Sequence, residues 1–274
     1  MSKFFTTRIS NPEYEVDQLR WITVKSKALN RRADITLFVP LVSSYEFPMD
    51  VVILLHGVYG SHWAWAMNGG VHKTVGRLIG QGKIRPMVLV MPSDGLYGDG
   101  SGYLQHQTED YEKWIVEDVV TVVQEQVAGV NKLSNIFITG LSMGGYGALR
   151  LGAKYPTVFR SFSGLSSITE FPQMALFLEG GDVRELSRKV LREESVLECL
   201  LANKGKLPYF RFDCGTEDIL IQYNRNLHRN LLENNIRHHY AEYPGGHQWD
   251  YWKTHIEDSL LFFNTWQNPD QKHA

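Results

Sequence analysis

The chain of 274 residues is long enough for one large α/β domain with a substantial core, and its formal net charge of −2 gives no electrostatic reason to expect a nucleic acid or an anionic membrane as partner. The first residues lack the apolar core of a signal peptide, no run of 18 apolar residues occurs, and the two cysteines form no disulfide or metal-binding pattern. We therefore expect a soluble cytoplasmic protein in which Cys199 and Cys214 are reduced and buried, folded as a single domain over residues 1–274.

The first half of the chain alternates strand and helix patterns. Residues 18–26 and 33–40 alternate apolar and polar side chains, which is typical of two antiparallel strands joined by a polar turn. Continuous apolar runs at 50–55 and 86–91 predict strands that are buried on both faces of a parallel sheet. Helices are expected over residues 71–81 and 109–127.

The stretch IFITGLSMGGYGAL, which begins at residue 136, carries the strongest motif. Its first four residues are apolar and β-branched or aromatic for the most part, which predicts a buried strand, and a helix is expected over about 145–155. The letters GLSMG between them fit G-x-S-x-G, the nucleophile elbow in which a strained turn projects the serine, here Ser142, into a site. An ordinary serine in a glycine-rich turn is the alternative.

The second half of the chain continues the alternation. Residues 158–165 suit a strand, and residues 166–205 form an irregular, partly helical insertion that we expect to lie over the site. Strands are predicted at 207–214 and 236–242, and helices at 218–234 and 249–266. The pattern predicts a mainly parallel sheet with helices on both faces and antiparallel strands at one edge, so that ligands bind beyond the carboxyl ends of the strands.

A serine nucleophile needs a base, and histidine suits this role because its ordinary pKa lies near 6.5. We select His247, because it follows Pro-Gly-Gly directly after the last predicted strand and the glycines let its loop bend back toward Ser142. A solvent-exposed loop histidine is the alternative. His238 and His239 in a strand and His255 in a helix are expected to be surface or packed residues.

The imidazole needs a carboxylate that orients it and stabilises its charged form. Asp213, Glu217 and Asp218 cluster after the strand that begins at residue 207. We choose Asp218, because the glycine turn in CGTED places it past the strand end, whereas Asp213 still belongs to the strand. The resulting order, serine then aspartate then histidine, is the order expected on this kind of sheet.

An oxyanion hole would need two backbone N–H donors. The residue after the nucleophile, Met143, should supply one, and the loop HGVYG after the strand at 50–55 should supply the other. We nominate the amide of Val58, with Gly57 permitting the required backbone path. Tyr59 and Trp63 are candidates for the wall of an acyl pocket, with plain core packing as the alternative.

Four segments of the chain together resemble a known family. HGVYGSHWAW, GLSMGGYGAL, CGTEDIL and PGGHQWDYW are similar to the esterase D-like branch of the α/β-hydrolases, which includes carboxylesterases, S-formylglutathione hydrolases, feruloyl and acetylxylan esterases and mycolyltransferases. The ending GGHQWDYW looks most like the small bacterial carboxylesterases. The resemblance implies an α/β-hydrolase fold with Ser142, Asp218 and His247 as the triad and the amides of Val58 and Met143 as the oxyanion hole.

The chain is therefore predicted to be a serine carboxylesterase that forms an acyl-enzyme with a small-molecule ester and requires no metal or organic cofactor. Its substrates would be short-acyl, aryl or sugar esters. A glutathione thioesterase, an acyltransferase and a non-catalytic binding protein are the alternatives, and a homo-oligomer is compatible with the sequence. A set of aromatic residues would suit a phenolic or sugar ester, although core packing is the favoured explanation; they are Tyr59, Trp63, Trp65, Tyr97 and Tyr103. A polar group at 105–107 follows a glycine-rich loop and is a further candidate near the site, with a solvated loop as the favoured explanation.

Overall fold

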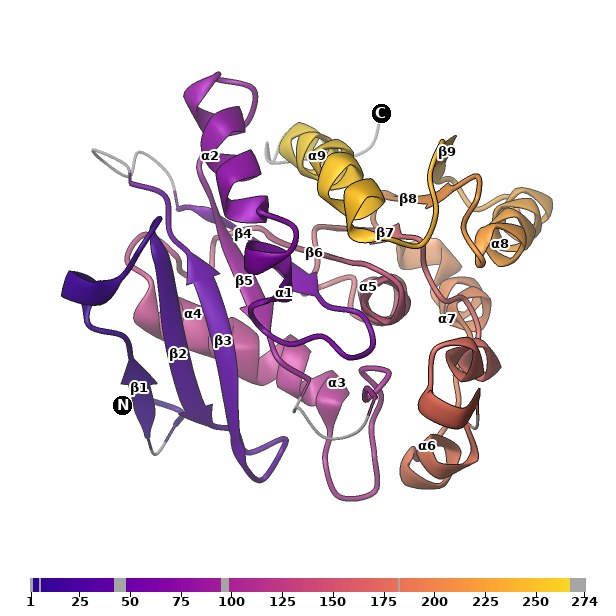
Figure 1. Cartoon of the computed structure of the whole chain (residues 1–274), viewed down its shortest axis with the longest axis horizontal. Coiled ribbons are helices and arrows are strands. Elements are labelled where there is room, and N and C mark those ends of the chain that lie inside the picture. Colours follow the sequence, from indigo (N-terminus) through magenta and orange to yellow (C-terminus); the bar gives the residue numbers. More distant parts are fainter. Residues whose placement is uncertain (1, 5, 42–47, 95–98, 182, 267–274) are drawn as a thin grey trace.

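The structure is a computed structural model that describes residues 2–4, 6–41, 48–94, 99–181 and 183–266. Within these residues a single nine-stranded sheet runs through the molecule (Figure 1). In sheet order its strands are β1 (Thr7–Ile9), β2 (Leu19–Lys25), β3 (Arg32–Phe38), β5 (Met87–Pro92), β4 (Asp50–Leu55), β6 (Ile136–Gly140), β7 (Ser161–Leu165), β8 (Phe210–Gly215) and β9 (His239–Tyr243).

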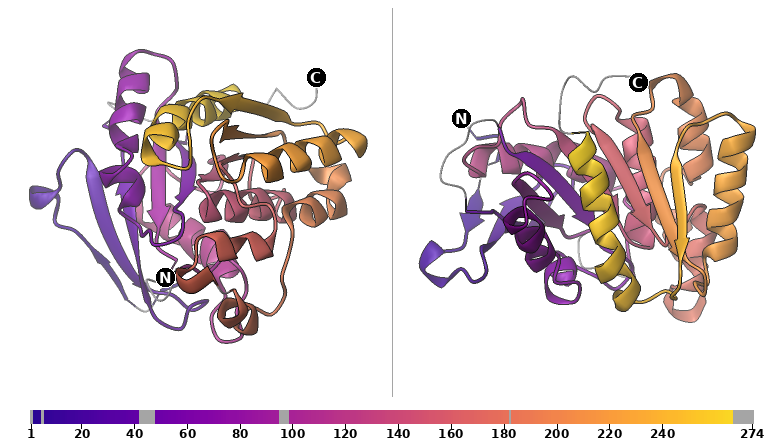
Figure 2. Two further views of the ribbon diagram at one scale, coloured as in Figure 1. Left: turned by 45° about the vertical axis from the view of Figure 1, so that its right-hand side comes forward. Right: turned by 90° about the horizontal axis from the view of Figure 1, so that it is seen from above.

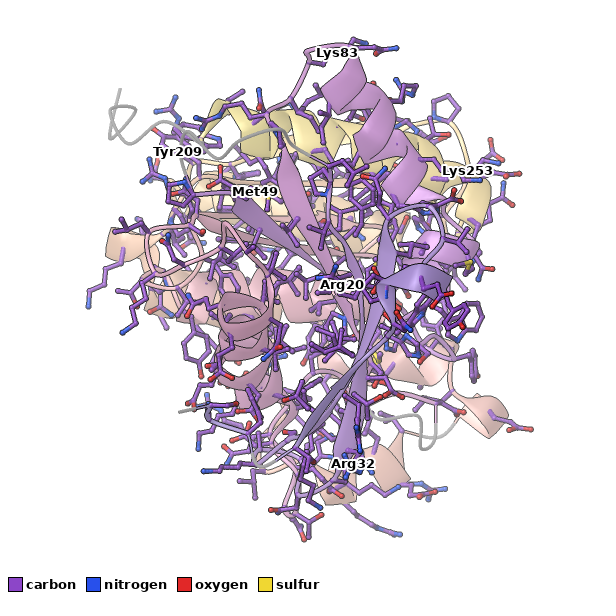
Figure 3. All side chains as sticks on the ribbon, turned by 90° about the vertical axis from the view of Figure 1, so that its left-hand side faces the viewer. Arg20, Arg32, Met49, Lys83, Tyr209 and Lys253 are labelled. Atoms are coloured by element: carbon purple, nitrogen blue, oxygen red, sulfur yellow. The ribbon has the colours of Figure 1, made fainter. Side chains whose placement is uncertain are left out.

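The six strands from β5 to β9 are parallel, and β1, β2 and β3 form an antiparallel edge beside β5. This edge faces the viewer in Figure 3, where Arg20 and Arg32 are labelled on it. The arrangement confirms the predicted mainly parallel sheet with antiparallel strands at one edge. The short strand β1 was not predicted, because only three residues pair and none of them is buried.

Helices cover both faces of the sheet (Figures 1 and 2). The residues of β4 show why, since Val51, Ile53 and Leu55 enter one apolar core and Val52 and Leu54 enter another. The second core is closed by α1 (Ala64–Met67), α2 (Val71–Gly80) and α9 (Trp249–Thr265). The first is closed by a helical run of α3 (Tyr111–Lys113), η2 (Trp114–Val119) and α4 (Val120–Gln126), and by α5 (Met143–Lys154), α7 (Val196–Ala202) and α8 (Ile221–Glu233).

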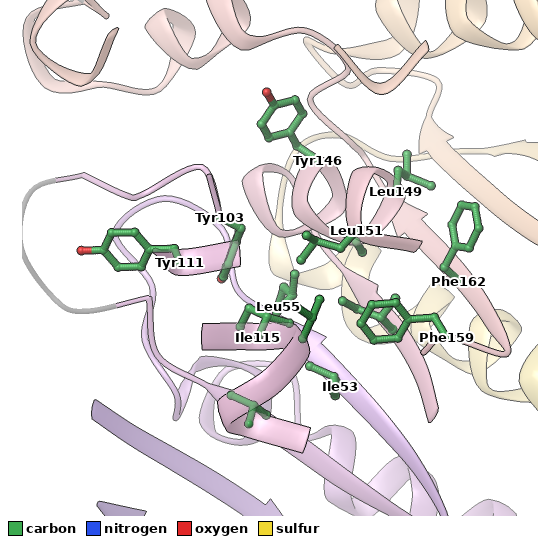
Figure 4. Packing of buried hydrophobic residues seen from close by; sticks show 14 of the residues in the cluster. Ile53, Leu55, Tyr103, Tyr111, Ile115, Tyr146, Leu149, Leu151, Phe159 and Phe162 are labelled. Atoms are coloured by element: carbon green, nitrogen blue, oxygen red, sulfur yellow. The ribbon is translucent and has the colours of Figure 1, made fainter. Parts of the chain in front are cut away.

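The core between β4 and α5 contains the largest group of buried side chains near the centre of the sheet. Ile53 and Leu55 of β4 lie in it with Leu151 of α5, and Phe159 and Phe162 extend it toward β7 (Figure 4). This packing fixes α5 against the strands, and α5 begins at the residue that follows Ser142.

The insertion between β7 and β8 is helical in short pieces. It contains η3 (Phe171–Leu176), η4 (Glu179–Gly181), α6 (Arg184–Lys189), α7 and η5 (Lys204–Lys206). In Figure 1 this segment lies along the right-hand side of the molecule, and its helix α7 packs against α5.

Strand ends differ from the prediction by a few residues. Strand β7 begins at Ser161 rather than at 158, because the amides of Val158 and Phe159 bond back to Tyr155 at the end of α5. Cys199 and Cys214 are both buried and unpaired, as expected. Within the described ranges, every helix is too short or too polar to cross a membrane.

Candidate active site

Ser142 lies between the last residue of β6 and the first residue of α5 with φ 54° and ψ −117°. A positive φ is strained for a residue with a side chain, and the surrounding chain must hold it. The Ser142 amide donates to the carbonyl of Leu165, and its carbonyl accepts from the amides of Tyr146 and Ile168, at 3.0, 3.0 and 3.2 Å. These three bonds fix the turn from both sides, so the elbow predicted from GLSMG is present in the backbone.

The glycines of the elbow are required by close backbone contacts. A Cβ added to Gly140 would lie 2.4 Å from the carbonyl carbon and oxygen of Gly144. One added to Gly144 would lie 2.2 Å from the carbonyl oxygen of Leu55. Both distances are far below van der Waals contact with atoms that cannot turn away, so α5 can cross this closely over β6 and β4 only with glycine at these positions.

Three side chains from distant parts of the sequence meet at the carboxyl ends of β6, β8 and β9. The Nε2 of His247 lies 3.0 Å from Ser142 Oγ, and its Nδ1 lies 2.9 and 3.0 Å from the two carboxylate oxygens of Asp218. Because a carboxylate only accepts, Nδ1 carries the proton and Nε2 is left to accept from the serine hydroxyl. The structure thus brings together the three residues selected from the sequence.

The Asp218 side chain is completely shielded from solvent, and the Leu220 amide donates to its Oδ1 at 2.8 Å. Burial alone would raise the pKa of Asp218, but the hydrogen bond and charge of His247 and the Leu220 amide together lower this pKa below its usual value. Asp218 is therefore a carboxylate at neutral pH and can stabilise a positive charge on the imidazole.

The two other acidic candidates have different positions. Asp213 lies inside β8, where it pairs with Arg211 at 2.8 Å and accepts a hydrogen bond from the Tyr251 hydroxyl at 2.8 Å. Glu217 is exposed, and its contact with the loop before His247 is a hydrogen bond from its backbone amide to the carbonyl of Gly245. Neither carboxylate contacts His247.

The histidines that were set aside are packed or exposed, as expected. The Nε2 of His238 lies 2.8 Å from the Nδ1 of His228, and the His238 ring stacks against aromatic residues of β8. His255 stacks on Tyr243, and His239 is exposed.

The peptide between Gly57 and Val58 has a fixed orientation. The Gly57 carbonyl accepts from the His56 Nδ1–H at 2.7 Å and from the Gly60 amide at 3.2 Å. Because this peptide is trans, the Val58 N–H points away from those two donors. Gly57 itself adjoins Ser142, since a Cβ placed on it would lie 3.4 Å from the Cβ of Ser142.

Met143 is the first residue of α5, so its amide has no acceptor within the helix. Within the part of the chain that the structure describes, neither the Met143 amide nor the Val58 amide donates to a backbone carbonyl. The helix N-terminus adds a partial positive charge at the same place. Two free donors beside a serine hydroxyl are suited to bind an oxyanion.

His56 was not selected from the sequence, although it stands directly before Gly57. It is buried, with Nδ1–H on the Gly57 carbonyl and Nε2 accepting from the Asp94 amide at 3.2 Å. Its own carbonyl accepts from the Tyr103 hydroxyl at 3.0 Å. The signal in the sequence was its position between a buried strand and the glycine-containing loop at 57–60.

The aromatic residues near the site divide into two groups. Tyr59 and Trp63 are 62% and 42% exposed, so the core-packing alternative does not describe them. Trp65 and Tyr103 are fully buried in the core, and Tyr97 lies outside the described residues. Of the four residues in this set that the structure describes, Tyr59 and Trp63 therefore present aromatic surface at or near the loop at 57–60.

The insertion reaches the site through Phe177. Its ring stacks on the imidazole of His247 with centroids 4.7 Å apart and planes inclined by 26°, and Trp252 meets the same imidazole at 88°. The Tyr59 hydroxyl donates to the Phe177 carbonyl. The segment at 166–205 thus contacts both Tyr59, in the loop at 57–60, and His247.

A buried ionic network attaches the insertion to α5. The fully buried Arg150 pairs with Glu194 at 2.5 Å and with Glu112 at 3.3 Å, and Lys154 contacts the same two carboxylates at 3.0 and 2.7 Å. Burial alone would raise the pKa of Glu194, but the charge and hydrogen bonds of Arg150 and Lys154 lower this pKa below its usual value.

A separate cavity of about 750 Å³ is lined in part by Asp99 and Leu178. His106 and Gln107 line it, and His106 is buried with its Nε2 donating to the Ser101 carbonyl at 2.8 Å. His106 is therefore enclosed, whereas Gln105 and Gln107 are exposed, as the solvated-loop alternative expects. Across the described ranges, no group of three or more His, Cys, Asp or Glu side chains is arranged to hold a metal ion.

Comparison with known proteins identifies the family. The model of the Esterase family, described as "Putative esterase", matches residues 26–263, and the chain belongs to this family. It is 27% identical over 264 residues to an acetyl esterase of Caldicellulosiruptor saccharolyticus, covering 87% of this chain and 95% of that protein.

Solved structures with the same fold include a ferulic acid esterase with a TM-score of 0.77 at 22% identity, covering 96% of this chain and 100% of that one. An S-formylglutathione hydrolase from Agrobacterium tumefaciens has a TM-score of 0.74 at 18% identity, covering 98% and 100%. The fold is thus that of the α/β-hydrolases, and the protein is a carboxylic ester hydrolase.

Proposed function

We propose that this esterase acts through an acyl-enzyme on Ser142, with His247 as general base and acid and Asp218 as its orienting carboxylate. The observation that supports this assignment best is the unbroken chain of hydrogen bonds from Ser142 Oγ through both imidazole nitrogens to Asp218. Such a chain activates a hydroxyl that is otherwise a weak nucleophile.

The reaction proceeds in two halves. His247 Nε2 accepts the proton of Ser142 Oγ as the oxygen attacks the ester carbonyl, and the same proton then passes to the leaving alcohol. A water molecule next gives a proton to Nε2 and attacks the acyl-enzyme, and Nε2 returns this proton to Ser142 Oγ as the acid is released. In both halves Asp218 stabilises the imidazolium, and the amides of Val58 and Met143 stabilise the oxyanion.

The proposed substrates are short-acyl, aryl or sugar esters, bound as small molecules without a nucleic acid or a membrane as partner. The similarity to an acetyl esterase supports a short acyl group. The exposed rings of Tyr59 and Trp63 beside the oxyanion loop offer flat apolar surface to an acyl or aryl group.

We place the protein in the cytoplasm, acting as one α/β-hydrolase domain. The two buried and unpaired cysteines are consistent with a reducing compartment.

The test is a series of initial rates on p-nitrophenyl esters from acetate to decanoate, with Ser142→Ala as control. We expect the rates to be highest for acetate or butyrate and to fall by about 10⁴-fold or more in Ser142→Ala. A fluorophosphonate probe should label the unsubstituted protein and leave Ser142→Ala unlabelled. Appreciable turnover by pure, folded Ser142→Ala would reject the assignment of Ser142 as the nucleophile. If S-formylglutathione were the one compound turned over in a Ser142-dependent way, the substrate would be a thioester and not an ester.

A further inference from the structure

Phe177 is the residue of the insertion that touches the proposed base. Its ring covers one face of the His247 imidazole at a centroid distance of 4.7 Å, and it is contributed by a segment that lies 70 positions earlier in the chain than the histidine. The contact involves neither the nitrogen that faces Ser142 nor the nitrogen that faces Asp218, so it leaves both hydrogen bonds free to form.

Two hydrogen bonds tie the backbone from Phe177 to Glu179 to other loops, and a third joins those loops to each other. The Tyr59 hydroxyl donates to the Phe177 carbonyl, and the Tyr59 amide donates to the Asp99 carbonyl at 3.0 Å. On the far side of Phe177, the Glu179 amide donates to Asp99 Oδ2 at 2.8 Å. Tyr59 and Asp99 therefore hold the segment at the carbonyl of Phe177 and two residues later, at Glu179.

The loop that carries His247 is rich in glycine. It contains Gly245, whose φ of 132° is accessible mainly to glycine, and Gly246 directly before the histidine. Two adjacent glycines leave the loop backbone many alternative conformations, and a histidine ring can also rotate about its side-chain bonds. Packing against Phe177 and Trp252 restricts the ring in addition to its hydrogen bonds to Asp218 and Ser142.

We propose that Phe177 is a positioning residue for His247, and that the hydrogen bond from Tyr59 to its carbonyl holds the ring in place. This inference rests on the proposed role of His247 as the base. It deepens that function, because the insertion then takes part in catalysis by orienting the base in addition to bordering the pocket. It also joins the oxyanion loop, which carries Tyr59 next to Val58, to the histidine on the opposite side of the serine.

The first experiment separates positioning from substrate binding. In Phe177→Ala the ring is lost, and we expect kcat for p-nitrophenyl acetate to fall about 10- to 100-fold with little change in KM, because a small displacement of a catalytic group has this cost. Phe177→Tyr keeps a flat ring and should restore most of kcat. A matched control is Leu176→Ala, which truncates the exposed neighbouring side chain and should leave kcat close to its original value.

A rise in KM with unchanged kcat would show that Phe177 is only a wall of the substrate pocket, and would overturn the proposal. A fall in melting temperature with unchanged kcat would also overturn it, because the ring would then serve stability alone. Each variant is also treated with the fluorophosphonate probe, with and without Ser142→Ala. Labelling that still requires Ser142 shows that the proposed mechanism holds, so the outcomes above then concern the role of Phe177 alone.

The second experiment is a double-mutant cycle on the Tyr59 hydroxyl. Tyr59→Phe removes only the donor to the Phe177 carbonyl and is expected to lower kcat by about 3- to 10-fold, the cost of one neutral hydrogen bond. In the Phe177→Ala background the same substitution should have almost no further effect, because the ring that the bond positions is absent. Tyr14→Phe, at an exposed tyrosine, is the matched control. Fully additive effects of Tyr59→Phe and Phe177→Ala would contradict a shared action on His247.

Discussion

The Nδ1 of His56 lies 2.7 Å from the carbonyl oxygen of Gly57, the next residue in the chain. The other ring nitrogen accepts from the Asp94 amide, so the imidazole is held at both ends inside the protein. Because the Gly57 carbonyl and the Val58 N–H belong to one trans peptide, this contact sets the direction of the proposed oxyanion donor before any substrate binds. A donor that is already oriented does not have to reorganise when negative charge develops.

Replacing His56 should therefore impair the chemical step. In His56→Leu the Gly57 carbonyl loses its main donor and the peptide can turn, so we expect kcat to fall about 100-fold, close to the cost of losing one oxyanion donor. His56→Asn places an amide N–H near the position of Nδ1 and should recover part of this loss. Steady-state kinetics with p-nitrophenyl acetate measures both, and an effect on KM alone would contradict the assignment.

Replacement by asparagine should lower the activity at Asp218 and the stability at Asp213. Asp218→Asn removes the acceptor that fixes the His247 tautomer, so we expect kcat to fall by about 10⁴-fold with little change in stability. Asp213→Asn leaves the buried guanidinium of Arg211 without its charge partner, and the free energy of unfolding should fall by about 3–5 kcal/mol.

Urea unfolding together with kcat per folded molecule separates these two effects. The assignment of the acid would be wrong if Asp213→Asn, when folded, lost as much activity as Asp218→Asn.

The elbow glycines predict a contrast with a glycine elsewhere in the chain. Gly144→Ala forces a Cβ to within 2.2 Å of the Leu55 carbonyl oxygen, and we expect little folded or active protein. Gly76→Ala, in the exposed middle of α2, meets no atom within 4 Å and should stabilise the protein by about 0.5–1 kcal/mol. Expression yield and thermal melting curves test the pair; an active, stable Gly144→Ala would refute the close crossing.

The low pKa of Glu194 predicts how acid affects stability. A carboxylate whose pKa is lower in the folded chain than in the unfolded chain stabilises the fold above its unfolded pKa of about 4.3, and this contribution disappears as the pH falls through the lower folded value. Glu194→Gln should therefore lower the melting temperature at pH 7 and flatten its decline below about pH 4.5. Melting curves between neutral and acid pH check this; a parallel decline in both proteins would contradict it.

Much of this architecture could be predicted from the sequence because local patterns specify it. Apolar runs such as that of β4 specify buried strands, and GLSMG specifies the turn at Ser142. The contact between Phe177 and His247 could not be predicted, because the insertion has no regular period and two aromatic residues carry no signal that they pair. The ion pair of Arg150 and Glu194 could not be predicted either, because in the sequence each resembles an ordinary surface charge and the fold alone buries them together.

The insertion leaves the sheet after β7 and returns at the neighbouring strand β8, whereas Ser142, Asp218 and His247 are all attached outside it. Exchange of this segment therefore leaves the three residues in place, but a foreign segment must also supply the ring that Phe177 packs on His247. A second condition concerns neither the substrate nor the pocket. Arg150 stays behind in α5, fully buried, with its shortest ion pair directed at Glu194 of the insertion. A foreign segment that lacks an acid at this place leaves Arg150 with the longer contact to Glu112, at 3.3 Å, to balance its charge.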